Sequence, residues 1–429
     1  MPSALRPVRH LTLTGACAPI LAMAAACGGS GGTVASPATP VASRPAAVAA
    51  PRRPALPPGA DTCDPNAYYQ FAVTQLRQHP QAAVAAYYWM QRLSPASPLA
   101  YYSERVARLL ADRDLLRGYV DEDRRTLQSA AVRRIDSLQV RAITLDPFFP
   151  QFLDEQLIIT YWTVVIGRRV RATTSASFGV SDEEIEVYVR NELNNRADSA
   201  TQAWLAYARG EYRSAADYWA EVLKRDSTDT DLMARRAKAL FLGGKLDSAH
   251  AQLEATLRAA RRSDARTMKY IYDSKVLWEY ALGWIDELQK HDSAAREAYQ
   301  RALVEDLSFY PAHFRLATVA LHERDTATAA TELQRAIEIK EDDFSSRLLL
   351  GALQAAQRAY GPATEQLRRA SEIEPWVAYP HFVLGKVRSQ TADSSGAAAE
   401  YRRFLALAPQ TDPNVRVARQ RLAALPGGP

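Results

Sequence analysis

The chain has 429 residues, of which 47% are hydrophobic and 24% are charged, and this balance supplies enough apolar surface for a well-buried body. A formal net charge of +5, mixed in sign along the sequence, excludes the strongly basic surface that would indicate nucleic-acid binding. Length alone leaves the number of domains open, because a repeat array grows without one central core.

Residues 1–26 predict an export signal. Arg6 and Arg9 give a positive start, and residues 11–26 form an uncharged, mostly apolar run that is too short to span a membrane. The run ends in Leu-Ala-Met-Ala-Ala-Ala before Cys27, and Gly-Gly-Ser-Gly-Gly follows it. This junction resembles the lipobox at which lipoprotein signal peptidase cleaves before an acylated cysteine, although Ala24 stands where Leu is usual.

The resemblance implies lipidation at Cys27, with the mature chain anchored to the cell envelope and facing the periplasm. The residue after Cys27 is Gly28, whereas some lipoproteins are retained at the inner membrane by Asp at this position. Gly28 therefore favours the outer membrane. Lipidation leaves Cys63 as the only thiol of the mature chain. Ordinary cleavage and secretion is the alternative, and it would permit a disulfide between Cys27 and Cys63.

Residues 27–63 consist mainly of Gly, Ala, Pro, Ser and Thr, so they cannot bury enough apolar surface to offset the entropy of ordering. They predict a disordered tether that holds the body away from the lipid surface. From residue 64 onward, apolar residues recur at helical spacing, and the alternation typical of strands is missing. The body is therefore predicted to be all-α.

Residues 197–410 contain six units with one common period, interrupted near 258–272 by an insertion that lengthens the step from Ala249 to Ala295. The eighth position of each unit is small: Ala203, Ala237, Gly283, Ala317, Gly351 and Gly385. The twentieth is always Ala: Ala215, Ala249, Ala295, Ala329, Ala363 and Ala397. The twenty-fourth is large: Trp219, Leu253, Tyr299, Leu333, Leu367 and Tyr401. Small residues let two paired helices approach closely while the large residue fills the gap beside them.

This pattern resembles the tetratricopeptide repeat family, whose unit is a pair of antiparallel helices. The resemblance implies an α-solenoid, a right-handed superhelix of stacked pairs. Val222, Thr256 and Phe404 stand at the twenty-seventh position, where Ala is usual. Pro375 and Pro409 are predicted to stop the second helices of the last two pairs. Residues 411–429 then predict a capping helix and a tail.

The repeat pattern is weaker in residues 64–196, which predict an irregular helical region with degenerate units. Ala83 and Ala142 fit second helices, residues 157–166 predict a buried helix, and Ser181 begins a capping box with Glu184. We expect this region to continue the same superhelix.

Catalysis has no recognisable basis in the sequence. The motifs of zinc proteases, phosphate loops, nucleophile elbows and redox cysteine pairs are missing, and the seven His are scattered. His313 and His322 share a helix, but their spacing does not form a metal-ligand face. We therefore expect no metal, no cofactor and no enzymatic activity. An active site assembled from distant residues is the alternative.

Binding is the function that the resemblance favours, because the first helix of each pair lines the concave surface in this family. Positions two, five, nine and twelve carry over to Trp204, Tyr207, Lys238, Phe241, Tyr280, Trp284, Phe314, Tyr379, Phe382 and Lys386. Aromatic rings with scattered Lys suit a peptide anchored by apolar side chains. Alternatively, several of these rings cover neighbouring helices, as residues on amphipathic helices usually do.

Capture of acidic C-terminal tails is not expected. Members of the family that bind such tails use Lys at position five and Asn at position nine of one unit. This chain has other pairs at these positions, such as Tyr280 with Trp284. Arginine clusters at residues 168–171 and 258–266 either contact anionic lipid or are solvated helix faces and loops.

These observations predict a membrane-tethered scaffold that binds other proteins or peptides in the bacterial envelope, for assembly, secretion or transport. The alternative is a lipoprotein that captures a ligand such as a glycan on aromatic platforms, with its binding insertion in the irregular first half.

Overall fold

The computed structural model describes residues 50–112, 114–116, 129–149, 163, 182–195, 198–266 and 274–426. All regular structure in these ranges is helical, which confirms the all-α prediction. None of the helices in these ranges is long and apolar enough to cross a membrane. The predicted leader, Cys27 and Ser181 lie outside the described residues, as does nearly all of residues 157–166.

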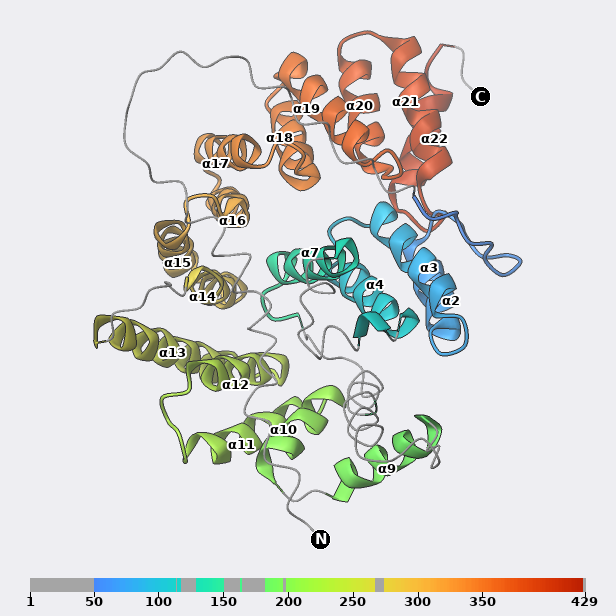
Figure 1. Cartoon of the computed structure of the whole chain (residues 1–429). Coiled ribbons are helices and arrows are strands. Elements are labelled where there is room, and N and C mark those ends of the chain that lie inside the picture. The colour runs from blue at the N-terminus through green and yellow to red at the C-terminus, as the bar shows by residue number, and fades with distance from the viewer. Residues whose placement is uncertain are drawn as a thin grey trace, which may run out of the picture.

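The helices form two consecutive groups and a separate helix between them (Figure 1). The first group is α2 (Pro65–Gln75), α3 (Pro80–Leu93), α4 (Pro98–Ala111) and α7 (Ala130–Leu145), and α9 (Asp182–Asn195) follows it. The second group begins with α10 (Ser199–Ala208), α11 (Tyr212–Leu223), α12 (Thr230–Leu242), α13 (Leu246–Arg266), α14 (Val276–Leu288), α15 (Asp292–Glu305) and α16 (Tyr310–His322). It ends with α17 (Thr326–Ile339), α18 (Phe344–Ala356), α19 (Tyr360–Ile373), α20 (Tyr379–Gln390), α21 (Ser394–Leu407) and α22 (Asn414–Ala423).

Local sequence sets the ends of many helices. Aspartate side chains at six helix starts accept a backbone N–H of the first turn: Asp64, Asp198, Asp229, Asp325, Asp343 and Asp393. Proline occupies the first turn of α2, α3, α4, α16 and α20, where its missing N–H leaves no helix bond unmade. The second helices α19 and α21 end just before Pro375 and Pro409, as predicted.

Helices α10 to α21 form six pairs, and the small residues predicted at the crossings are all buried. A Cβ built on Gly283 would lie 2.7 Å from Tyr299 Cε1, and one on Gly385 would lie 2.7 Å from Tyr401 Cε1. The partner rings are themselves fully buried. The glycines therefore permit a helix approach that a methyl group would block. The order of pairs confirms the predicted α-solenoid.

The turn inside each pair contains one residue with a left-handed backbone. These residues repeat with the period of the units, broken only at the insertion: Gly210, Gly244, Lys290, Arg324, Arg358 and Ala392, with φ between 59° and 78°. Such residues end a helix and let the next one begin antiparallel. The predicted insertion lies partly in α13, which has 21 residues where α15 has 14.

The C-terminal helix α22 packs on α21 through Val415, Ala418 and Leu422, while its charged face stays exposed. This arrangement is that of a capping helix, since it covers the apolar side of the last pair and presents a polar outer face.

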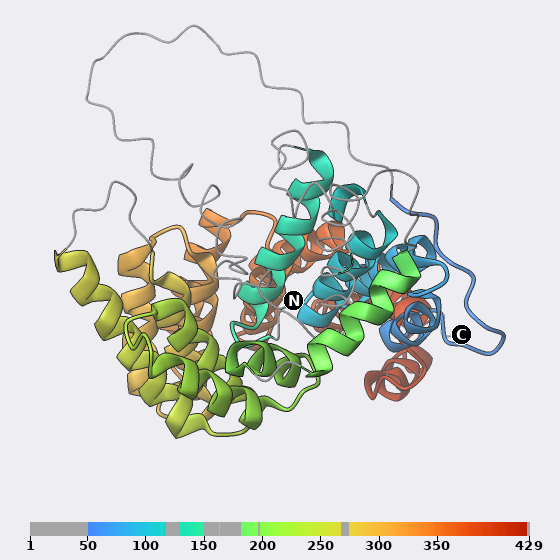
Figure 2. The same ribbon diagram turned by 60° about the horizontal axis from the view of Figure 1, so that its bottom comes forward.

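The first group of helices departs from the expected continuous superhelix. Helices α2, α3, α4 and α7 pack in sequence on one another. They do not continue the stack beyond α10, but fold back toward the C-terminal pairs of the second group (Figure 1). Trp89 meets Trp376 with ring centroids 5.1 Å apart, and Arg92 Nη1 donates to Glu374 Oε1 at 3.0 Å. Near the C-terminus, Gln410 N donates to Asp61 Oδ2 at 2.8 Å. The chain consequently closes on itself, with α4 and α7 inside the arc of the repeats (Figure 2).

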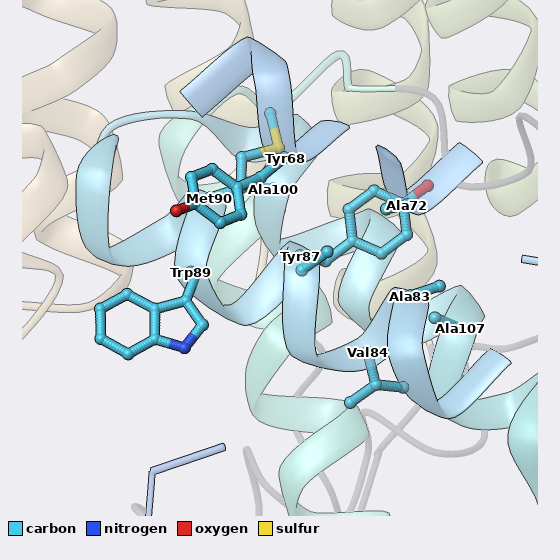
Figure 3. Packing of buried hydrophobic residues seen from close by; sticks show 10 residues of the cluster. Tyr68, Ala72, Ala83, Val84, Tyr87, Trp89, Met90, Ala100 and Ala107 are labelled. Carbon is cyan, nitrogen blue, oxygen red and sulfur yellow. The ribbon is translucent and has the colours of Figure 1, made fainter. Parts of the chain in front are cut away.

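Residues 50–63 correct the prediction of a disordered tether over residues 27–63, because this described part is packed against the helices. Arg53 is the main anchor: its guanidinium lies 5.0 Å from the Trp89 ring centroid and 5.5 Å from that of Tyr68. Trp89 Nε1 donates to Pro51 O at 2.9 Å. Figure 3 shows the buried cluster of α2, α3 and α4 to which Tyr68 and Trp89 belong. The tether prediction therefore remains for residues 27–49 alone.

The crossing glycines give a direct stability test. Gly283→Ala is expected to lower the free energy of unfolding by about 1–3 kcal/mol, because the added methyl overpacks against Tyr299. Gly361→Ala is the matched control: a Cβ there meets nothing within 4 Å, so the change is expected to be neutral or to stabilise by up to about 1 kcal/mol. Urea unfolding followed by circular dichroism measures both. Equal midpoints for the two variants would contradict the packing account.

Candidate functional site

The inner face of the arc is formed by the first helices of the pairs (Figure 1), and all ten predicted groove residues belong to these helices. Tyr207, Tyr280 and Phe382 are buried. Trp204, Lys238, Phe241, Trp284 and Phe314 are half-buried, and Tyr379 and Lys386 are exposed. We refer to these ten residues as the groove residues. Several of them pack within their own pair, as Phe382 does on Tyr401 and Phe404 of α21, and the chain itself covers the middle part of the face.

Phe148, which follows α7, covers α12. Its ring stacks on Phe241 with centroids 3.8 Å apart and planes inclined by 14°. Phe148 is only 2% exposed, and it belongs to one apolar cluster with Ala237, Leu282 and Ile285 of α12 and α14. A buried aromatic pair contributes about 0.5–1.5 kcal/mol beyond its apolar area. A predicted groove ring is thus already occupied by another part of the chain.

A backbone group of the same segment meets α14. Tyr280 donates its hydroxyl to Thr144 O at 3.1 Å. Burial raises the pKa of Tyr280, so the phenol stays protonated and able to donate. This hydrogen bond is independent of the side chain at position 144, since it uses the main-chain carbonyl.

Charges complete the contact. Desolvation raises the pKa of Asp146, and the charges of Lys238 on α12 and Arg315 on α16 oppose this rise. Lys238 is strongly affected: desolvation lowers its pKa to about 7, an effect that Asp146 opposes and Arg235 reinforces. Arg315 also lies 3.6 Å from the Trp284 ring centroid, so this guanidinium is held close beside a groove ring.

Arg141 of α7 adds contacts to α16 and to the cap of α18. It donates to the Tyr310 hydroxyl at the start of α16, and its Nη2 lies 3.5 Å from Asp343 Oδ1, the cap of α18. Further along, burial raises the pKa of Glu374 to about 7 in spite of the nearby Arg92 and Arg141. The covered face therefore extends from α12 to α19 through discrete polar contacts.

The two ends of the groove face are less covered. At α20, Tyr379 is 41% exposed, and Lys386 Nζ lies 5.8 Å from the buried Phe382 ring. At α10, the Trp204 ring centroid lies 4.7 Å from the Arg235 guanidinium. These ends keep an aromatic ring next to a cation, which is the chemistry expected for a peptide site.

Sequence reasoning missed Thr144, Asp146, Phe148 and Arg141 as groove contacts. The available signal was Asp-Pro-Phe-Phe directly after a helix, where two large rings stand in what would otherwise be a polar turn.

The described residues hold no group of His, Cys, Asp and Glu suited to a metal ion. His313 instead pairs with Glu332 at 2.6 Å, and His381 pairs with Glu400 at 2.7 Å two repeats later. Because both pairs join the first helix of a unit to the second at equivalent positions, we assign them a structural role. Cys63 forms no disulfide within the described chain, and burial raises the pKa of its thiol.

No protein-family model and no curated protein matches the chain. Among solved structures, the tetratricopeptide protein YrrB, described as having an unusual peptide-binding site, is 19% identical with a TM-score of 0.39, over 48% of this chain and 100% of its own. PilF of Pseudomonas aeruginosa is 17% identical with a TM-score of 0.41, over 55% and 98% of the two chains. The C-terminal part of a repeat protein from Cytophaga hutchinsonii is 15% identical with a TM-score of 0.43, over 52% and 83%.

The helix pairs of this chain define its class. Six pairs with buried small residues at their crossings and a terminal capping helix make it a helical-repeat protein of the tetratricopeptide type in fold.

The lowered pKa of Lys238 predicts a pH-dependent stability. A lysine whose folded pKa is about 7 binds fewer protons when folded than when unfolded between pH 7 and its usual value of 10.5, so stability rises with pH across this window. Lys238→Met removes this dependence. We expect the stability gain of Lys238→Met over wild type to be largest near pH 6 and to shrink toward pH 10 in urea unfolding. Lys386→Met, at an exposed site, is the control, and a constant difference for Lys238→Met would contradict the account.

Proposed function

We propose that this chain is a lipid-tethered, non-catalytic scaffold that binds proteins or extended peptides in the bacterial cell envelope. The observation that carries the proposal is the inner face of the repeats, where the Phe241 ring and the Tyr280 hydroxyl hold the helix end and turn at residues 144–148. Such a surface recognises a chain through its backbone and a few anchors, which suits protein binding. The export signal and the Cys27 junction in the sequence support the location.

Groove variants test the binding part of the proposal. The full chain, produced with its leader in a bacterial host, is crosslinked in intact cells, and the crosslinked proteins are identified by mass spectrometry. We expect Trp284→Ala/Phe314→Ala and the more exposed pair Tyr379→Ala/Lys386→Ala each to reduce specific envelope crosslinks severalfold. Tyr218→Ala, which removes an exposed ring from α11 instead of the inner face, is the control. Crosslinks that persist in both groove variants would contradict a role for this surface.

The N-terminus of the same product tests the anchor. We expect an acylated Cys27 and a membrane-bound chain, with Cys27→Ser moving the protein to the soluble fraction. Cys63→Ser keeps the cysteine count equal and is expected to leave the protein in the membrane fraction. A soluble wild-type chain with a disulfide between Cys27 and Cys63 would overturn the anchor and leave the groove proposal standing.

A further inference from the structure

The segment of residues 144–149 is held from two opposite sides. Phe148 packs toward the repeats, in the cluster of α12, α13 and α14. Phe149 packs the other way, in the cluster of α4 and α7, with its ring centroid 5.5 Å from that of Tyr102. Thr144, Asp146 and Phe148 therefore face the groove, and Phe149 fixes the segment to the first group of helices.

The groove contacts three chemically different features of this segment. Phe241 accepts an aromatic ring in a stack at 3.8 Å. The charges of Lys238 and Arg315 act on the carboxylate two residues earlier and lower its pKa, against the larger raising effect of desolvation. Tyr280 donates to a main-chain carbonyl two residues before that. An aromatic anchor, an acidic residue and a backbone contact, all from one short stretch, are the features by which peptide-binding surfaces obtain specificity.

Asp146 also shapes the segment that is recognised. Its Oδ1 accepts the backbone N–H of Phe148 at 2.8 Å, which closes an Asx turn. The turn sets the direction of the residue two positions after the acid, so Asp-x-aromatic is a unit that forms its own local geometry. A partner segment with the same spacing can form this turn without help from the rest of the first helical group.

Burial of the charged groups in the contact between this segment and the repeats costs free energy. Desolvation raises the pKa of Asp146 and lowers that of Lys238, which means that both charged forms are disfavoured where they lie. Helix α7 packs along α4 and reaches the repeats through individual side chains of its last turns and the segment after it. The segment is thus joined to the repeats by a small set of contacts, each of a kind that another chain can also make.

We propose that residues 144–149 occupy in cis a recognition site on α12, α14 and α16, and that the partner of this site is a protein segment with an acidic residue followed two positions later by an aromatic residue. The inference rests on the proposed scaffold function and specifies its partner chemistry. Binding of such a segment displaces Phe148 from Phe241, so the first group of helices competes with the partner for the groove.

A peptide that copies residues 142–151, labelled with fluorescein, tests this by fluorescence anisotropy against the full chain. In wild type the internal segment competes, so weak binding is expected. Phe148→Ala empties the ring site and is expected to bind the peptide at least about tenfold tighter, because a site that is free a larger fraction of the time has a lower apparent Kd. Asp146→Asn, which makes no cavity, is expected to shift affinity in the same direction and covers the case in which Phe148→Ala misfolds.

Second-site variants and altered peptides define the outcome. The gain is expected to disappear in Phe148→Ala/Phe241→Ala, and peptides with Asn in place of the acid or Ala in place of the first aromatic are expected to bind more weakly. The inference is overturned if neither Phe148→Ala nor Asp146→Asn gains affinity, if the gain survives Phe241→Ala, or if a scrambled peptide binds equally well. Envelope crosslinks that still depend on Tyr379 and Lys386 in that case would leave the scaffold function intact and remove only this partner chemistry.

Discussion

The close approach of two helices in each repeat is the constraint on which the rest of this structure depends. Gly283, Gly351 and Gly385 leave no room for a side chain, because a Cβ there would come within 2.7 Å of a large residue on the paired helix. That residue is fully buried in each case. Uniform pairs then stack with a constant offset, and the first helices align along one inner face. The groove is a consequence of packing at six crossings, none of which touches a ligand.

What covers that face is a second, independent layer of organisation. The first helical group reaches back to the C-terminal pairs through aromatic and charged contacts, among them Trp89 with Trp376 and Arg92 with Glu374. Arg53 lies over the rings of Tyr68, Trp89 and Trp376, and so ties a segment that precedes every described helix to the start of the sixth repeat. The chain thereby forms a closed ring, and its internal contacts cover part of the inner face of the repeats (Figure 1).

The repeats could be predicted because their signal is local and periodic. Small, Ala and large residues recur with the period of one unit, so each unit supports the assignment of the others. The fold-back could not be predicted, because its contacts join distant segments without a period, as in Arg92 with Glu374. The groove residues follow from register alone, but their exposure does not, because rings such as Tyr280 and Phe382 pack on the second helix of their own pair. The contact of Phe148 could not be predicted either, because its partner Phe241 is far away in sequence.

Closure of the ring places one thiol, that of Cys63, where the first helical group meets the C-terminal pairs. Cys63 Sγ lies 3.6 Å from Ala406 O at the end of α21, and Ala406 is exposed. In an Ala406→Cys variant treated with a short bismaleimide at low protein concentration, the account predicts a link between positions 63 and 406 within the monomer, identified by peptide mapping. Ser214→Cys, an exposed site on α11 away from the junction, is the matched control and is expected to give no such link to Cys63. Absence of the 63–406 link, or equal linking to position 214, would contradict a chain that folds back on its own repeats.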